Sequence, residues 1–127
     1  MQSLNGFNTT KWGPSAWLFL HCITLNYNTK SKKEYFMFFK SLQYVLPCRV
    51  CRDHYKNIIN STGKKTHLSI QKFESRETLS YWLFCVHNKV QQQVYIKSGL
   101  LKDLPPYKSN KTDFKKAMLV YENYRFK

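Results

Sequence analysis

Two cysteines with two residues between them, Cys48 and Cys51, are the residues in this chain best suited to chemistry. They follow Pro47, where a new helix is expected to begin. A Cys-x-x-Cys pair at a helix start can form a reducible disulfide or hold one sulfur as a thiolate, because the unpaired N–H groups favour negative charge there. The basic neighbours Arg49 and Arg52 add to that effect. A disulfide closing so small a loop constrains the unfolded chain little, so we expect the pair to transfer electrons.

The other two cysteines, Cys22 and Cys85, stand alone among apolar residues and are expected to be buried thiols. The first ten residues are polar and show neither the apolar run of a signal peptide nor the arginines of a transit peptide. Four cysteines without a secretory signal do not predict a disulfide framework. Redox catalysis or metal binding is therefore the leading explanation for the close pair. A bond between Cys22 and Cys85 stays open, although reduced thiols are favoured.

The chain is strongly basic, with a net charge of +14 from 21 Lys and Arg against 7 Asp and Glu. Such a charge attracts nucleic acid, acidic lipid or an acidic protein. The basic residues are scattered, however, and form no compact arginine stripe, so a basic solvated surface is favoured and no nucleic-acid partner is expected. No apolar run approaches the roughly 18 residues of a membrane span. A length of 127 residues predicts a single domain.

Apolar spacing predicts helices along nearly the whole chain. The first helix should begin near Gly13-Pro14, the second should run to about Leu46, and the third should start at Pro47 and carry the two cysteines. The polar segments 26–31 and 60–65 are expected to connect them. The first helix presents one face made of Trp17, Leu20, His21 and Thr24.

The fourth helix has the strongest signals. Ser75 can cap it, and Glu77 falls in its first turn. Gly99 and Pro105-Pro106 end that region, and Thr112 or Asp113 could cap a last short helix. The predicted fold is all-α, a four-helix bundle with an additional short C-terminal helix. The fourth helix should bury Leu79, Trp82, Leu83, Val86, Val90 and Val94, and the last helix Phe114, Ala117, Met118 and Tyr121.

Three blocks of sequence together resemble the FAD-linked sulfhydryl oxidases of the Erv/ALR type. They are Trp12-Gly13-Pro14-Ser15-Ala16-Trp17-Leu18-Phe19-Leu20-His21, Pro47-Cys48-Arg49-Val50-Cys51, and Trp82-Leu83-Phe84-Cys85-Val86-His87-Asn88-Lys89-Val90. The resemblance covers about residues 10–98, which would form the core of one sulfhydryl oxidase domain over 1–127 with an extension over about 99–127. A chain this short is more similar to members from large DNA viruses than to the longer cellular ones.

The resemblance implies a helical bundle that binds FAD non-covalently and oxidises protein dithiols to disulfides. Electrons would pass to oxygen and yield hydrogen peroxide. It also implies a homodimer, a thioredoxin-like protein as the substrate, and a location in the host cytoplasm or the virion. No membrane attachment is expected.

The resemblance also assigns residues. Cys48 would be the sulfur that a substrate thiolate attacks. Cys51 would lie nearest the flavin, and a lowered pKa of its thiol would assist electron donation. Metal ligands are not implied. The expected cofactor-binding residues are Trp12, Gly13, Trp17, His21, His87, Asn88, Val90, Gln91 and Lys97.

The chain departs from the family pattern at three places. Gln91 stands where the family has a second Asn, and it keeps both a donor and an acceptor. Lys97 is displaced by one position, so it could meet a FAD phosphate only if the helix has ended before it. Cys85 is one position later than the cysteine of the structural disulfide found in cellular members, and no cysteine follows it. That bridge is expected to be absent.

Two other interpretations compete with the oxidase. Cys48, Cys51 and His54 have spacing suited to zinc, with a fourth ligand from His21, Cys22 or His87. A second close pair of ligands is missing. The net charge also suggests a basic helical module that binds nucleic acid, although no docking motif is recognisable.

Overall fold

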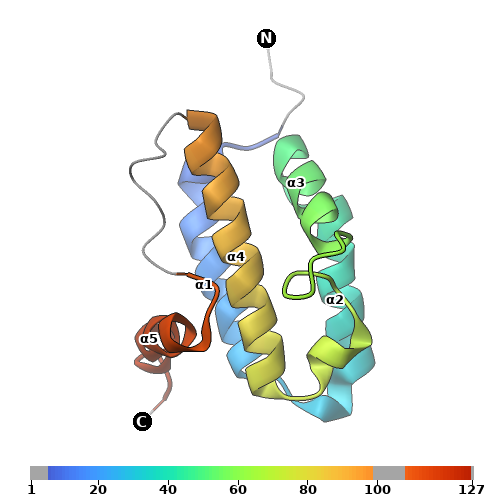
Figure 1. The fold of residues 1–127 in the computed structure, drawn as a ribbon, viewed down its shortest axis with the longest axis vertical. Coiled ribbons are helices and arrows are strands. Elements are labelled where there is room, and N and C mark those ends of the chain that lie inside the picture. The colour runs from blue at the N-terminus through green and yellow to red at the C-terminus, as the bar shows by residue number, and fades with distance from the viewer. Residues whose placement is uncertain (1–5, 99–107, 127) are drawn as a thin grey trace.

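The computed structural model describes residues 6–98 and 108–126, and within these ranges the chain is helical without any strand (Figure 1). This confirms the predicted all-α bundle with a short fifth helix. The side chains of residues 94–98, including Val94, and the residues Gly99 and Pro105-Pro106 lie outside the part of the chain that the structure describes. The α-helices are α1 (Thr9–Leu25), α2 (Lys32–Val45), α3 (Arg49–Ile59), α4 (Arg76–Ser98) and α5 (Lys111–Glu122), with short 3-10 helices η1 (Thr29–Ser31) and η2 (Ile70–Phe73).

Helix α1 packs on α4 and α2 packs on α3, while α3 also contacts α4 and closes the bundle. The first turns of α1 and α3 and the last turns of α4 lie at the same end of the molecule, at the top of Figure 1. The two cysteines at the start of α3 therefore share an end with the start of α1. No described helix is both long enough and apolar enough to cross a membrane.

Helix α1 begins at Thr9, before the predicted start near Gly13-Pro14. The side chain of Asn8 caps it by accepting a hydrogen bond from the N–H of Thr10 at 3.0 Å. Pro14 consequently lies inside the helix, where it lacks the N–H that would bond to the preceding turn. The prediction was wrong because proline was placed at the first turn, while the asparagine cap was overlooked.

The cap of α4 is confirmed, since Oγ of Ser75 accepts the N–H of Thr78 at 3.0 Å. The cap predicted for α5 is wrong. Asn110 is the capping residue and accepts the N–H of Asp113 at 2.8 Å, so Thr112 and Asp113 lie inside the first turn. Asparagine caps a helix as well as aspartate does, and here it comes first.

The main core fills the space between the four long helices. The buried stripe of α4 is confirmed from Leu79 to Val86, and Val90 packs against it. Tyr27 is also buried, at 2% exposure, and its hydroxyl donates to the carbonyl of Phe73 at 2.7 Å. The segment 26–31 is thus anchored in the core, although its polar composition predicted a simple connection.

A second apolar cluster attaches α5 to α4. Phe84 and Cys85 of α4 pack against three of the four inward residues predicted for α5, namely Phe114, Ala117 and Met118, and the fourth, Tyr121, is partly buried against the same cluster. The rings of Phe84 and Phe114 meet edge to face with centroids 5.6 Å apart. Apolar packing therefore joins the C-terminal helix to the bundle.

Candidate functional site

Cys48 and Cys51 lie at the N-terminus of α3 with free thiols. Cys48 is the capping residue, in an extended conformation, and its Sγ accepts the N–H of Cys51 at 3.3 Å. Arg52 donates from its guanidinium to the carbonyl of Leu46 at 2.7 Å, which fixes the turn before the pair. The sulfur that receives the helix N–H is therefore Cys48.

The expected lowering of the Cys51 pKa is wrong for the reduced pair. Burial, the hydrogen bond with Cys48 and the charge of Cys48 raise the pKa of the Cys51 thiol to about 12. The backbone hydrogen bond and the positive charge of Arg52 act in the opposite direction but do not outweigh them. The positive charge near Cys51 is visible in the sequence, but the burial of its thiol is not.

Trp17, His21 and His87 meet between α1 and α4. The rings of Trp17 and His87 stack with centroids 3.8 Å apart and planes at 9°. Nε2 of His21 lies 2.9 Å from Nδ1 of His87, so one imidazole donates to the other. The ring of Tyr121 in α5 stacks on the ring of His21, with centroids 4.7 Å apart. We call these four residues the aromatic–imidazole cluster.

Burial keeps both histidines of the cluster neutral. Desolvation, followed by the charge of His87, lowers the pKa of His21 to about 3, and desolvation lowers the pKa of His87 to about 4. Nδ1 of His21 is buried and has no hydrogen-bond partner in the described part of the chain. Depending on the tautomer it is a bare acceptor or an unmatched N–H donor. A buried polar atom of this kind suits a bound polar ligand.

The aromatic–imidazole cluster fits the FAD that the sequence resemblance implies. It offers flat ring faces for a planar heterocycle and a polar atom still to be paired. Gly13 adds open space, because a Cβ built there would meet only Cβ of Thr9 at 4.0 Å.

The remaining predicted cofactor residues lie outside the cluster. Asn88 is buried and donates to Oγ of Ser109 at 3.3 Å, while Val90 packs on the core. Gln91 is half-buried on α4. Lys97 lies within α4, which continues to Ser98, so the condition set for a phosphate contact, an earlier helix end, is not met.

Trp12 has a defined partner in the chain. Its indole Nε1 donates to the carbonyl of Phe7 at 3.0 Å, and the N–H of Phe7 donates to the carbonyl of Pro47 at 2.7 Å. This connects the start of α1 to the residue before Cys48. Sequence reasoning missed Gly6, Phe7 and Tyr121 as parts of the site. For Tyr121, the inward face predicted for α5 was the available signal.

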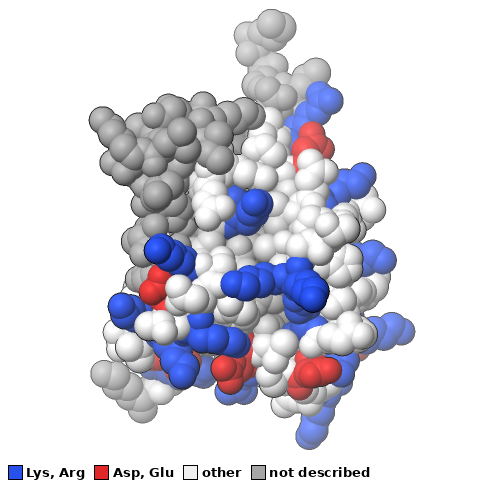
Figure 2. Space-filling model, viewed as in Figure 1, with Lys and Arg blue, Asp and Glu red and all other residues white. Residues whose placement is uncertain are grey.

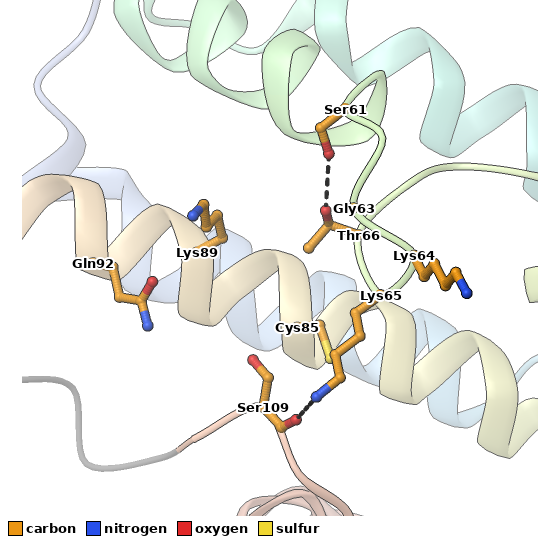
Figure 3. A pocket seen from close by; sticks show the side chains of 9 residues that line it. All are labelled: Ser61, Gly63, Lys64, Lys65, Thr66, Cys85, Lys89, Gln92 and Ser109. Atoms are coloured by element: carbon orange, nitrogen blue, oxygen red, sulfur yellow. Dashed lines mark hydrogen bonds between the residues drawn. The ribbon is translucent and has the colours of Figure 1, made fainter.

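A separate hollow of about 450 Å³ opens between α4 and the segment that follows α3. Figure 3 shows Lys89 and Gln92 reaching it from α4 and Lys65 joined by a hydrogen bond to the carbonyl of Ser109. Lysines prevail over acidic side chains on this face of the molecule (Figure 2). The lining suits an anionic group, and it contains none of the predicted cofactor-binding residues. It consists of Ser61, Gly63, Lys64, Lys65, Thr66, Cys85, Lys89, Gln92 and Ser109.

The zinc interpretation finds no support in the arrangement of side chains. Over residues 6–98 and 108–126, no three His, Cys, Asp or Glu residues are grouped so that they could hold a metal ion. His21 and His87 are engaged with each other, and Cys22 and Cys85 carry free thiols. The ligand set considered for Cys48, Cys51 and His54 is therefore not assembled.

Comparison with known proteins identifies the family. The model of the Erv1 / Alr family matches residues 14–119. A probable FAD-linked sulfhydryl oxidase of Acanthamoeba polyphaga mimivirus is 37% identical over 84 residues, which are 63% of this chain and 56% of that protein. The FAD-linked sulfhydryl oxidase ERV1 of Arabidopsis thaliana is 33% identical over 86 residues, covering 65% of this chain and 41% of the plant protein.

The mitochondrial FAD-linked sulfhydryl oxidase ERV1 of Saccharomyces cerevisiae is 27% identical over 86 residues, covering 65% of this chain and 42% of the yeast protein. The chain thus spans about half the length of the curated relatives it matches.

Proposed function

Because this chain belongs to the Erv1 / Alr family, we propose that it is an FAD-dependent thiol oxidase whose Cys48–Cys51 pair takes electrons from protein dithiols. The observation that carries the proposal is the placement of this pair at the N-terminus of α3, where the Sγ of Cys48 accepts a helix N–H at 3.3 Å. The names of the three relatives support the reaction class and the cofactor.

In the proposed reaction the pair starts as a disulfide. A substrate thiolate attacks Sγ of Cys48, forms a mixed disulfide and displaces the sulfur of Cys51. A second substrate thiolate then attacks the substrate sulfur of the mixed disulfide. The product disulfide leaves and both cysteines are reduced. The second step is supported by the position of Cys48 as the capping residue, where the N–H of Cys51 can stabilise negative charge on the sulfur of Cys48 as it is released.

FAD, when bound, would supply the acceptor for the electron pair of the two thiols and the route of that pair to oxygen, with hydrogen peroxide as the product. The chain's contribution is to hold the ring system. Trp17 and His87 offer stacked aromatic faces, and Nδ1 of His21 offers an unpaired polar atom. Because the pKa values of His21 and His87 are about 3 and 4, both imidazoles stay neutral at neutral pH and contribute hydrogen bonds without charge.

We further propose Trp12, Gly13, Asn88, Val90 and Gln91 as surroundings of the cofactor. Gly13 is supported by the open space beside it, and Gln91 by its half-buried position on α4. We assign Lys97 no contact with a FAD phosphate, because α4 continues past it to Ser98. Residues 1–127 would act as one oxidase domain.

The proposed partners are a protein dithiol, with a thioredoxin-like protein as the first to test, and a second copy of this chain. A homodimer is supported by apolar side chains exposed on α1 and α2: Phe19 is 62% exposed and Met37 51% exposed. Sedimentation of the purified protein tests it, and a monomer at micromolar concentration would contradict it. The mimivirus relative supports placing the protein in the cytoplasm or virion of an infected cell, which fractionation would test.

Purification tests the proposal directly. The protein should be yellow and should release flavin when denatured, and it should consume oxygen when a dithiol is added. A colourless protein loaded with zinc would contradict the proposal. So would a flavin-free protein that binds DNA in a salt-sensitive manner.

A further inference from the structure

Residues Gly6 and Phe7 form a short segment, here called the N-terminal strap, that lies along the backbone before α3. Gly6 forms an isolated antiparallel bridge with Cys48. The N–H of Phe7 donates to the carbonyl of Pro47 at 2.7 Å, and the carbonyl of Phe7 accepts from the indole of Trp12 at 3.0 Å. Both main-chain polar groups of Phe7 are therefore used to join the start of α1 to the redox pair.

The strap can approach so closely only because residue 6 is glycine. Gly6 has φ of +103°, a conformation that other residues rarely adopt. A Cβ built on it would lie 2.4 Å from the carbonyl oxygen of Pro47 and 3.0 Å from Cα of Cys48. Both atoms belong to the backbone, so neither can move aside at low cost. Gly63 makes a useful contrast, because a Cβ there would meet nothing nearer than Oγ of Ser61 at 3.4 Å.

The strap bears on the conformation of Cys48 itself. Cys48 has φ of −155° and ψ of 124°, and this extended conformation directs its Sγ to the N–H of Cys51. The two residues before it are each held by their carbonyls: Leu46 by Arg52 at 2.7 Å and Pro47 by the strap at 2.7 Å. With both carbonyls held, Cys48 has little freedom to turn its sulfur away.

We propose that the N-terminal strap is a positioning element for the redox pair, with Gly6, the main chain of Phe7 and the indole of Trp12 as its working parts. The inference rests on the proposed redox role of Cys48 and Cys51. By restricting Cys48, the strap raises the effective concentration of one thiol for the other and so favours the disulfide. The side chain of Phe7 takes no part, because it is 74% exposed and the contacts are made by main-chain atoms.

The test measures the thiol–disulfide equilibrium of the full-length protein with glutathione under nitrogen. In this equilibrium one protein disulfide and two molecules of reduced glutathione give one protein dithiol and one glutathione disulfide. The fraction of the Cys48–Cys51 disulfide is read by mass spectrometry after acid quenching and alkylation. No oxygen consumption is measured, so the result does not depend on whether the protein is an oxidase.

Gly6→Ala and Phe7→Pro should each lower the equilibrium constant for forming the protein disulfide by about three- to tenfold, because the strap is displaced or loses its donor. Trp12→Phe, which removes only the indole N–H, should give a smaller change in the same direction. Phe7→Ala and Gly63→Ala are the matched controls. Their equilibrium constants should stay within about twofold of the parent value, because neither substitution touches the contacts of the strap. Helix content and thermal midpoint should be unchanged, since the strap is exposed.

Equilibrium constants for Gly6→Ala and Phe7→Pro that both match the parent would overturn the proposal. The proposal would also be overturned if Phe7→Ala lowered this equilibrium constant as much as Phe7→Pro does, because the effect would then belong to the side chain of Phe7. A shifted equilibrium in a protein that consumes no oxygen would support the strap and refute the oxidase. An active oxidase whose Gly6→Ala and Phe7→Pro variants keep the parent equilibrium constant would support the oxidase and refute the strap.

Discussion

The imidazoles of His21 and His87 are bonded to each other, Nε2 to Nδ1 at 2.9 Å, across the contact between α1 and α4. Neither can take up a proton without placing a charge in a desolvated site. Their pKa values are about 3 and 4, against the usual 6.5. This pairing links the stability of the bundle to pH.

Acidification should destabilise the protein before its carboxylates titrate. A histidine with a lowered pKa stays neutral in the folded state, while the unfolded chain takes up a proton below about pH 6.5. Stability is therefore complete above that pH and falls as pH drops toward the folded pKa values, by up to about 1.4 kcal/mol per pH unit for each histidine. Urea unfolding between about pH 6.5 and pH 5 would measure the slope. His87→Gln should make the slope clearly shallower, and an unchanged slope would contradict the assignment.

The reactivity of Cys51 should keep rising well above neutral pH. With its pKa raised to about 12, only a small fraction of the thiol is ionised at neutral pH. Alkylation of Cys51 in the reduced protein should speed up about tenfold per unit from about pH 7 to pH 9, whereas a free cysteine derivative levels off near its pKa of about 8.5. Cys48→Ala should lower the pKa of Cys51 and raise its alkylation rate at a given pH, because the hydrogen bond and charge of Cys48 are removed. A rate that levels off below pH 9 in the parent would show that burial does not control this thiol.

His87→Leu should weaken retention of flavin by about tenfold or more, equivalent to about 1.4 kcal/mol or more of binding free energy. The substitution removes the ring that stacks on Trp17 at 3.8 Å and the hydrogen-bond partner of His21. Flavin retained after gel filtration measures the effect. His54→Leu is the control and should bind flavin as the parent does. Loss of flavin from the control, together with loss of bound zinc, would instead favour a metal site at His54.

Phe114→Ala should reduce the free energy of unfolding by about 3 kcal/mol. Phe114 is 5% exposed and packs against Phe84 and Tyr81, which join α5 to the bundle. Phe126→Ala is the control, since that ring is fully exposed, and it should have no measurable effect. Urea denaturation compares the two, and equal effects would mean that α5 is not anchored through this cluster.

The sequence predicted correctly those features that depend on interactions between residues close together in the chain. Ser75 and the apolar stripe of α4 gave that helix correctly, and the face of α1 placed Trp17 and His21 together. The pairing of His21 with His87 depends on how α1 packs on α4, which no local pattern contains. The pKa of Cys51 was mispredicted for the same reason, because its burial arises from the assembled bundle.

Two features, the burial of Tyr27 and the role of Gly6, could not be predicted from the sequence. Tyr27 sits in a polar segment, yet its hydroxyl reaches the carbonyl of Phe73 across the core. Gly6 gave no sequence signal, because the need for glycine arises only where the strap meets Pro47 and Cys48. Contacts between residues distant in sequence explain both omissions.

The central claim is that electrons pass from a dithiol through Cys48 and Cys51 to a bound flavin. Anaerobic addition of a dithiol to the purified protein, followed by its visible flavin absorbance, tests this most directly. The parent should bleach, and Cys51→Ser should keep its yellow colour without bleaching, while Cys22→Ala behaves as the parent. A Cys51→Ser variant that bleaches at the rate of the parent would contradict the account.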